Sequence, residues 1–188
     1  VGYVPYAADI STVFSNPYET SQNAVGNTEH RINQGALKIE HAGKELNISN
    51  VLGYQNSELV YNNVDIDFSP LDFNTFSRPI PGAENTVKVL TNELNLSSPA
   101  GAEKLNWVGG SYIFRQQVPI NQIIRTGEDA VMFDPSAPNQ VFNFNDGINT
   151  GVAFFGQLTY PLSKTLKLTA GIRYDYEERE ITTQTDFI

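Results

Sequence analysis

The sequence predicts an all-β protein, an antiparallel meander of about six strands arranged as three hairpins. Six segments of roughly a dozen residues alternate between apolar and polar side chains with a period of two. Short turns join these segments in pairs, whereas long polar stretches separate the pairs. The composition agrees, because a chain rich in Tyr, Phe, Asn, Thr and Gly suits strands and turns better than helices.

The last hairpin, at about 150–179, has the clearest alternation. Its second strand, about 165–179, places six apolar side chains on one face: Leu166, Leu168, Ala170, Ile172, Tyr174 and Tyr176. Its other face carries Lys167, Thr169, Gly171, Arg173, Asp175 and Glu177. The first strand covers about 150–161, and a Pro-containing turn at 161–164 separates the two, because Pro cannot continue a central strand.

Two earlier hairpins repeat this unit. Residues 30–42 and 46–60 flank a three-residue connection at 43–45, and residues 87–98 and 104–117 flank a turn at 99–103. The hairpins therefore cover about 30–60, 87–117 and 150–179. The remaining stretches, about 1–29, 61–86 and 118–149, are long, polar and irregular, with several prolines, and are predicted to be loops.

The difference in connection length favours the wall of a large transmembrane β-barrel. In an antiparallel meander all the short turns lie at one end and all the long loops at the other, as in barrels with periplasmic turns and extracellular loops. Strands of about 12–15 residues also exceed the ~9–11 needed to cross a bilayer. Six aromatic residues lie near strand ends and are predicted to form an interfacial girdle: Tyr54, Tyr112, Phe114, Tyr160, Tyr174 and Tyr176. A soluble β-sandwich is the alternative, although its loops need not segregate by length.

Charge and motifs exclude several classes of function. The net charge of −9, with only 12 scattered basic residues, excludes a nucleic-acid partner. The sequence contains no Cys, shows no visible signal peptide, and has no apolar run long enough for a transmembrane helix and no nucleophile elbow or Walker-type loop. We therefore expect no catalytic residues, no cofactor and no enzyme activity.

Two groups of residues are weighed as metal ligands. Asp65, Asp67 and Asp72 carry oxygen ligands of the kind that Ca²⁺ prefers, but they lack the EF-hand spacing, and the sequence favours a solvated acidic loop. His30 and His41 have neither the number nor the spacing of ligands that a zinc site needs. No metal site is predicted.

Two stretches resemble TonB-dependent receptors of the outer membrane. Residues 91–116 are similar to a hairpin of that family, with a Glu-Leu-x-Leu-x-Ser strand at Glu93–Ser98 and a following strand that carries Trp107, Gly110, Tyr112 and Phe114. Residues 150–178 resemble the next hairpin, with Phe-Gly-Gln, a Pro-containing turn and Leu-x-Leu-x-x-Gly-x-Arg-Tyr. The position between Leu94 and Leu96, often basic in relatives, is Asn95 here.

The resemblance implies part of an active transporter in the outer membrane of a Gram-negative bacterium. Members of that family import a scarce ligand of the siderophore, haem, cobalamin or glycan class, with energy supplied by the TonB system through a plug that is not part of this segment. Six strands correspond to about a quarter of a 22-stranded barrel. The chain begins in loop-like sequence and ends just after a strand, so we expect the outer strands to pair with further barrel strands, and the barrel surface to contact membrane lipid.

Candidate ligand contacts are the aromatic and Arg residues of the long loops, which supply large contact area. They are Tyr61, Phe76, Arg78, Arg125, Phe142 and Phe144. Each of the two inner loops has four acidic residues and one Arg, a net charge of −3, which disfavours a strongly anionic ligand. Lys167 and Arg173 lie on the polar face of the last strand and are predicted to face the lumen, because a charge facing lipid is costly. The alternatives are a soluble β-sandwich that binds glycans and a hydrolase built on a barrel.

Overall fold

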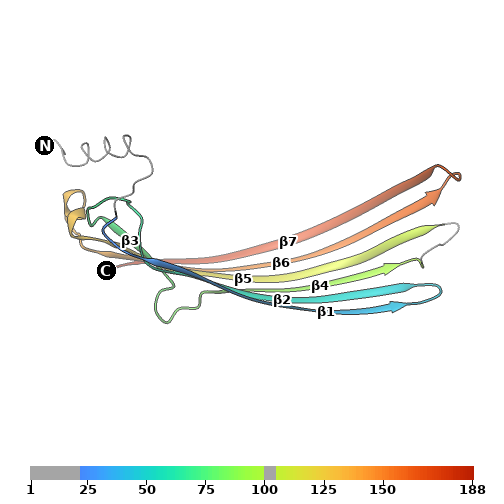
Figure 1. Ribbon diagram of the computed structural model, residues 1–188, viewed down its shortest axis with the longest axis horizontal. Helices are drawn as coiled ribbons and strands as arrows, with labels where there is room; N and C mark the ends of the chain where they lie inside the picture. The colour runs from blue at the N-terminus through green and yellow to red at the C-terminus, as the bar shows by residue number, and fades with distance from the viewer. Residues whose placement is uncertain (1–21, 100–104) are drawn as a thin grey trace.

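The computed structural model describes residues 22–99 and 105–188, which form one curved, open antiparallel sheet (Figure 1). Its elements are β1 (Asn27–Ala42), β2 (Asn47–Asp65), β3 (Asn74–Arg78), β4 (Thr86–Ser97), β5 (Asn106–Thr126), the 3-10 helix η1 (Glu128–Met132), β6 (Gln140–Pro161) and β7 (Lys167–Phe187). The predicted all-β meander is confirmed. No helix in the described ranges is both long and apolar enough to span a membrane.

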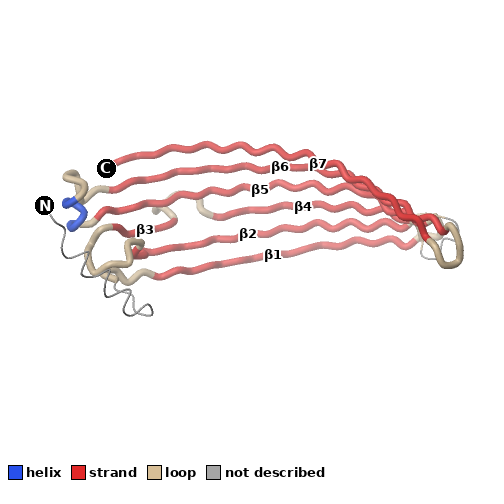
Figure 2. The backbone as a smooth tube through the Cα atoms, turned by 90° about the horizontal axis from the view of Figure 1, so that it is seen from above, coloured by secondary structure: helices blue, strands red, loops and turns tan. Residues whose placement is uncertain are grey.

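The three predicted hairpins are β1–β2, β4–β5 and β6–β7, and each pair is antiparallel. The strand ends that each hairpin turn joins lie together at one end of the sheet, and the long connections lie at the other end (Figures 1 and 2). All seven strands belong to a single sheet, in which β2 pairs with β4 and β5 pairs with β6. This is the meander that the connection lengths predict, and not the two facing sheets of a sandwich.

β3 and β4 share one strand position between β2 and β5. β2 pairs first with β4 and then with β3, and β5 does the same (Figure 2). The chain leaves the sheet after Arg78 and returns at Thr86, through a loop on the convex side (Figure 1). Pro79 and Pro81 lie in this loop and have no N–H to donate to a strand ladder, which explains the interruption. The prediction that 61–86 is irregular is therefore wrong at both ends and at β3.

The last three strands are also longer than the alternation predicts. β5, β6 and β7 contain 21, 22 and 21 residues, so the predicted loop at 118–149 shrinks to 127–139. The added segments contain apolar residues, such as Ile123, Phe142 and Phe144, but Pro, Asn, Gln and Asp interrupt the long period-two alternation by which a strand is recognised in sequence. At about 3.3 Å per residue these strands span about 70 Å, far more than a bilayer requires. The predicted loop 1–29 lies mostly outside the described residues, and its end belongs to β1.

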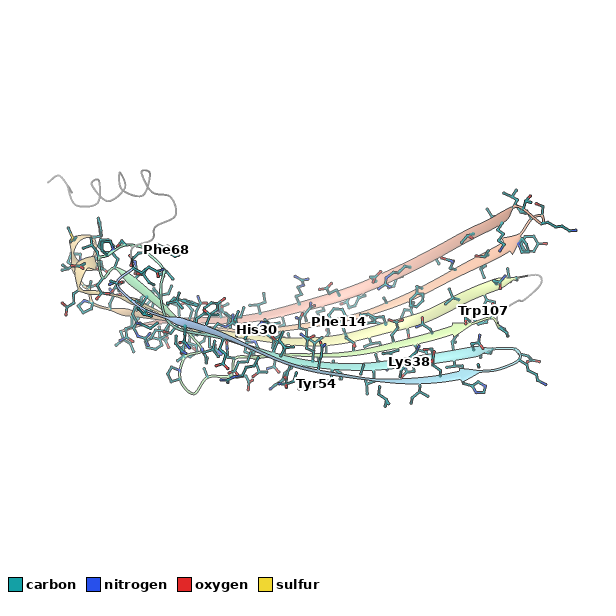
Figure 3. The ribbon with its side chains drawn as sticks, viewed as in Figure 1. His30, Lys38, Tyr54, Phe68, Trp107 and Phe114 are labelled. Carbon is teal, nitrogen blue, oxygen red and sulfur yellow. The ribbon has the colours of Figure 1, made fainter. Side chains whose placement is uncertain are left out.

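The pairing registers divide the side chains between a convex and a concave face. A row of directly opposed residues on one face runs Leu37, Leu52, Asn92, Ile113, Val152 and Tyr176. Tyr54 belongs to the same face, and Figure 3 shows it on the convex side of the sheet. Most large apolar residues of this face are exposed, for example Ile113 at 52% and Phe154 at 58%. The convex face thus presents an apolar surface that no described residue covers.

The buried residues gather mainly at the loop end of the sheet. Phe73, Ile80, Ile123 and Ala130 are buried there, where β3, the Pro-containing loop and η1 pack against β5. Ala153, in the middle of β6, is buried on the concave face. The buried apolar core formed by the described residues is therefore small. The backbone hydrogen bonds between neighbouring strands hold the long strands together.

Candidate functional site

Three predicted ligand contacts meet where β3 joins the sheet. The rings of Tyr61 and Phe76 pack edge to face, with centroids 5.4 Å apart. Arg78 is the register partner of Tyr61; its Nε donates to Oδ1 of Asn85 at 2.7 Å, and a terminal N–H donates to the carbonyl of Pro119 at 3.4 Å. Burial lowers the pKa of Arg78 below its usual value. A guanidinium has five N–H donors, so these two bonds leave others for a ligand.

The fourth predicted contact, Arg125, lies on β5 beside a polar cavity. A terminal N–H of Arg125 donates to Oγ of Ser77 at 3.0 Å, and the same oxygen accepts the backbone N–H of Asn63 at 3.0 Å. The adjacent cavity has a volume of about 860 Å³. Its lining includes Asn63, Asp72, Thr75, Arg125, Glu128 and Gln140. Amide, hydroxyl and carboxylate groups of this kind suit a hydrogen-bonding ligand rather than an apolar one.

The last two predicted contacts lie on the other face of the sheet from Tyr61 and Phe76. Phe142 and Phe144 are register partners of Ile123 and Asn121, and alternation along β5 places Arg125 on that same convex side. All six predicted contacts therefore lie in strands rather than in irregular loops. The structure brings Tyr61, Phe76 and Arg78 together and separates them from Phe142 and Phe144.

The acidic residues after β2 organise their own loop. Asp65 is only 1% exposed, and its carboxylate accepts the backbone N–H groups of Asn23, Asp67 and Phe68 at 2.9–3.1 Å. The carboxylate of Asp67 accepts the N–H of Asn74 at 2.7 Å. The prediction of a solvated acidic loop is thus wrong for Asp65, which satisfies buried backbone donors. Within the described ranges, no three His, Asp or Glu side chains are grouped to hold a metal ion.

The loop after β2 and the loop between β5 and β6 form one unit. The backbone N–H of Asp72 donates to the carboxylate of Asp129 at 2.8 Å, and the N–H of Gly127 donates to the carbonyl of Phe73 at 2.8 Å. A Cβ on Gly127 would lie only 2.1–2.3 Å from atoms of Asp72, so this close approach requires glycine. The end of the sheet near Tyr61, Phe76 and Arg78 is therefore bordered by two mutually braced loops.

At the level of the apolar band, the concave face carries most of the charged side chains of the strands. Alternation along β7 places Lys167 and Arg173 on this face. The guanidinium carbon of Arg173 lies 5.9 Å from the ring centroid of Phe155, within cation–π range. Three ion pairs of 2.7–2.8 Å join concave residues two apart on one strand: Lys38–Glu40, Arg173–Asp175 and Arg179–Glu177. The concave face is therefore the polar wall of the sheet.

Three aromatic residues lie together on the concave wall, a grouping that the sequence analysis does not predict. Tyr112 and Phe114, whose ring centroids are 6.0 Å apart, share this face with Phe155, so the prediction that they join the girdle of Tyr54 and Tyr174 is wrong. The rings of Phe114 and Phe155 each cover a glycine on the neighbouring strand. A Cβ on Gly151 would lie 2.3 Å from Phe114, and one on Gly110 would lie 2.7 Å from Phe155. The two glycines are a signal visible in sequence, but only the register shows which ring each one faces.

A family model described as TonB dependent receptor-like, beta-barrel matches residues 2–187. The match extends over all of the described strands and both of the braced loops.

Proposed function

This chain belongs to the TonB-dependent receptor β-barrel family, and on that premise we propose that it forms part of the barrel wall of a transporter that imports one scarce ligand. Members of the family are transporters rather than enzymes, and they work in the Gram-negative outer membrane with energy coupled through TonB. For this protein the proposed ligand is a siderophore, haem, a cobalamin or a glycan. In the proposed transporter the described strands hold and guide the ligand and perform no bond chemistry.

The contrast between the two faces of the sheet is the observation that carries this proposal. The convex face of β7 and its preceding turn is apolar from Leu166 to Tyr176, and the next convex residue is Glu178. This length agrees with the ~9–11 residues that a tilted strand needs to cross a bilayer. The concave face at the same level carries Arg173 and Asp175. A lipid-facing outside and a polar lumen explain both faces.

The connection lengths orient the sheet in the membrane. Short turns are periplasmic in transmembrane barrels and long loops are extracellular, so β3, η1 and the braced loops lie outside the cell. Lys167 and Arg173 then face the lumen, where a plug transmits the action of TonB. Bacterial transmembrane barrels contain at least eight strands, so we expect β1 and β7, the outer strands of this sheet, to pair with further strands in the complete barrel.

Tyr61, Phe76 and Arg78 are the best placed of the six proposed ligand contacts. They lie at the extracellular end on the side that leads into the lumen, and two aromatic rings beside a guanidinium supply both contact area and hydrogen-bond donors. Arg125, Phe142 and Phe144 lie at the same end on the convex side and are proposed as outer contacts. The net charge of −3 in each inner loop favours a neutral or cationic ligand over a strongly anionic one.

Uptake by cells tests the proposal directly. Cells that express the protein are offered a labelled panel of ferric siderophores, haemin, cobalamin and oligosaccharides, with and without a functional TonB. We expect accumulation of one class only, which disappears without TonB. Accumulation that does not depend on TonB, or accumulation of no member of the panel, contradicts the proposal.

A matched pair of variants tests the ligand contacts. The double variant Tyr61→Ala and Phe76→Ala removes both rings, and we expect the affinity for the accumulated ligand to fall at least about tenfold, as for central aromatic contacts. The control is Tyr176→Ala, the truncation of an exposed aromatic residue on the convex face that is not a proposed contact, and its affinity should stay within about twofold of wild type. Equal losses in the two variants would show that the concave side is not the contact side.

A further inference from the structure

Arg115 lies at the outer border of the apolar band on the convex face. It shares a row with Tyr54 and Leu90, both about half exposed, and the next convex residue along β5 toward the turn is Ile113. The Arg115 side chain is exposed, and among the described residues it forms no ion pair. A permanently charged group at the edge of an apolar surface extends its head toward polar surroundings and attracts an anion there.

Lys88 is the second cation at this border. It is directly opposed to Gln117, which makes it a diagonal neighbour of Arg115, at the ~7–8 Å separation that long side chains can bridge. Its ion pair with Glu84 is long, at 3.4 Å, and Lys88 is 44% exposed, so the pair adds little and Lys88 stays available. Two cations on adjacent strands can therefore contact a single anion.

The acidic residues nearby do not neutralise this pair. Glu58, on the β2 side of Lys88, is held by Arg31 at 3.3 Å. Glu178 and Glu180 continue the rows of Arg115 and Lys88, but on β7, two strand positions away and therefore about 10 Å from β5. The excess of positive charge therefore lies over β4 and β5, so an anion is expected on the β4 side of Arg115, next to Lys88.

The surface below Arg115 suits an acyl chain. Along the convex side of β5, Ile113 is followed toward the turn by Ser111 and Gly109, and Gly156 is the register partner of Gly109 on β6. These small residues form a low strip beside Phe154, which is 58% exposed. An apolar chain in this strip would lie directly beneath an anion held by Arg115 and Lys88.

We infer that Arg115 and Lys88 bind the phosphate of a lipid headgroup in the outer leaflet, with an acyl chain of that lipid lying along β5. Charge-assisted bonds from a guanidinium and an ammonium to phosphate are strong, and basic residues next to an apolar membrane surface are the usual means of holding anionic headgroups. The apolar strip distinguishes a phosphate-bearing lipid from free phosphate, which gains nothing from Ile113 or Phe154. This inference rests on the membrane placement in the proposed function.

Binding of defined lipids to the purified protein in detergent tests the site by native mass spectrometry. The probes are phosphatidic acid, diacylglycerol with the same acyl chains, and inorganic phosphate. We expect phosphatidic acid to bind at least about tenfold more tightly than diacylglycerol, and Arg115→Gln to remove this preference. Lys88→Gln should lower the affinity for phosphatidic acid by about threefold. The control, Lys44→Gln, removes an exposed cation in the β1–β2 turn and should bind like wild type.

Three results would overturn the inference. Arg115→Gln could bind phosphatidic acid as tightly as wild type, diacylglycerol could bind as tightly as phosphatidic acid, or inorganic phosphate could displace the lipid at an equal concentration, which would indicate a site for free phosphate. Failure of the proposed function has a different readout, because it appears in the wild-type protein as uptake that is absent or independent of TonB.

Discussion

Replacing Ile172 with Arg should destabilise the membrane-inserted protein strongly, because in the proposed transporter this side chain faces lipid near the middle of the apolar band. Ile172 is 80% exposed on the convex face of β7 and lies midway between Leu166 and Glu178. Six residues at about 3.3 Å per residue span about 20 Å of strand, or roughly 14 Å of depth at a tilt of about 45°. This depth is close to half the thickness of a ~30 Å hydrocarbon core, so Ile172 lies close to the midplane of the bilayer.

The expected penalty for Ile172→Arg is ~2–4 kcal/mol, the cost of a lipid-facing Arg at the midplane of a transmembrane barrel. Ile172 is directly opposed to Gly156, so the longer side chain meets no bulky neighbour across the strands and the penalty reports the lipid environment. The control is Thr169→Arg on the concave face, which loses only an exposed hydroxyl contact with Thr159 at 3.0 Å. That loss should cost at most ~0.5–1.5 kcal/mol.

A urea titration of the protein folded into lipid vesicles measures both free energies of unfolding. Ile172→Arg should lower the midpoint clearly more than Thr169→Arg, with unchanged slopes for both variants. Equal penalties in the two variants, or a larger penalty for Thr169→Arg, would refute the assignment of the convex face to lipid.

Two further predictions concern the wall and the loop end. Gly151→Ala places a methyl group against the ring of Phe114 and should cost ~1–3 kcal/mol in the same titration, whereas Gly35→Ala, with open space around its Cβ, should stay within about 0.5 kcal/mol of wild type; equal effects would contradict the packing of Phe114 over Gly151. Hydrogen bonds from the hydroxyl and N–H of Ser136 lower the pKa of Asp134, so its contribution to the 134–139 turn is present above the unfolded-state pKa and is lost as the pH falls through the folded value. Amide exchange in this turn should therefore lose protection below about pH 4, and an equal loss in Asp134→Asn would exclude this carboxylate as the cause.

The sequence by itself determined the class of fold and the pairing of the three hairpins. Alternation with period two can be recognised in the sequence wherever one face of a strand is apolar, as from Leu166 to Tyr176. The short turns at 43–45 and 161–164 show which strands are joined. The family was also recognisable from short motifs, such as the strand that contains Glu93 and the hairpin that contains Trp107.

Only the tertiary structure decided which residues share a site. The loop-end parts of β5, β6 and β7 mix apolar residues with Asn, Gln and Asp and show no long apolar alternation, and they form strands because their backbone donors and acceptors find partners on neighbouring strands. The shared position of β3 and β4 depends on pairing with β2 and β5, which are distant in sequence. Whether Phe114, Phe142 or Arg115 faces lipid, lumen or solvent depends on the register, and a shift of a single residue reverses every face. Register is a property of two strands together, which is why neither strand's sequence contains it.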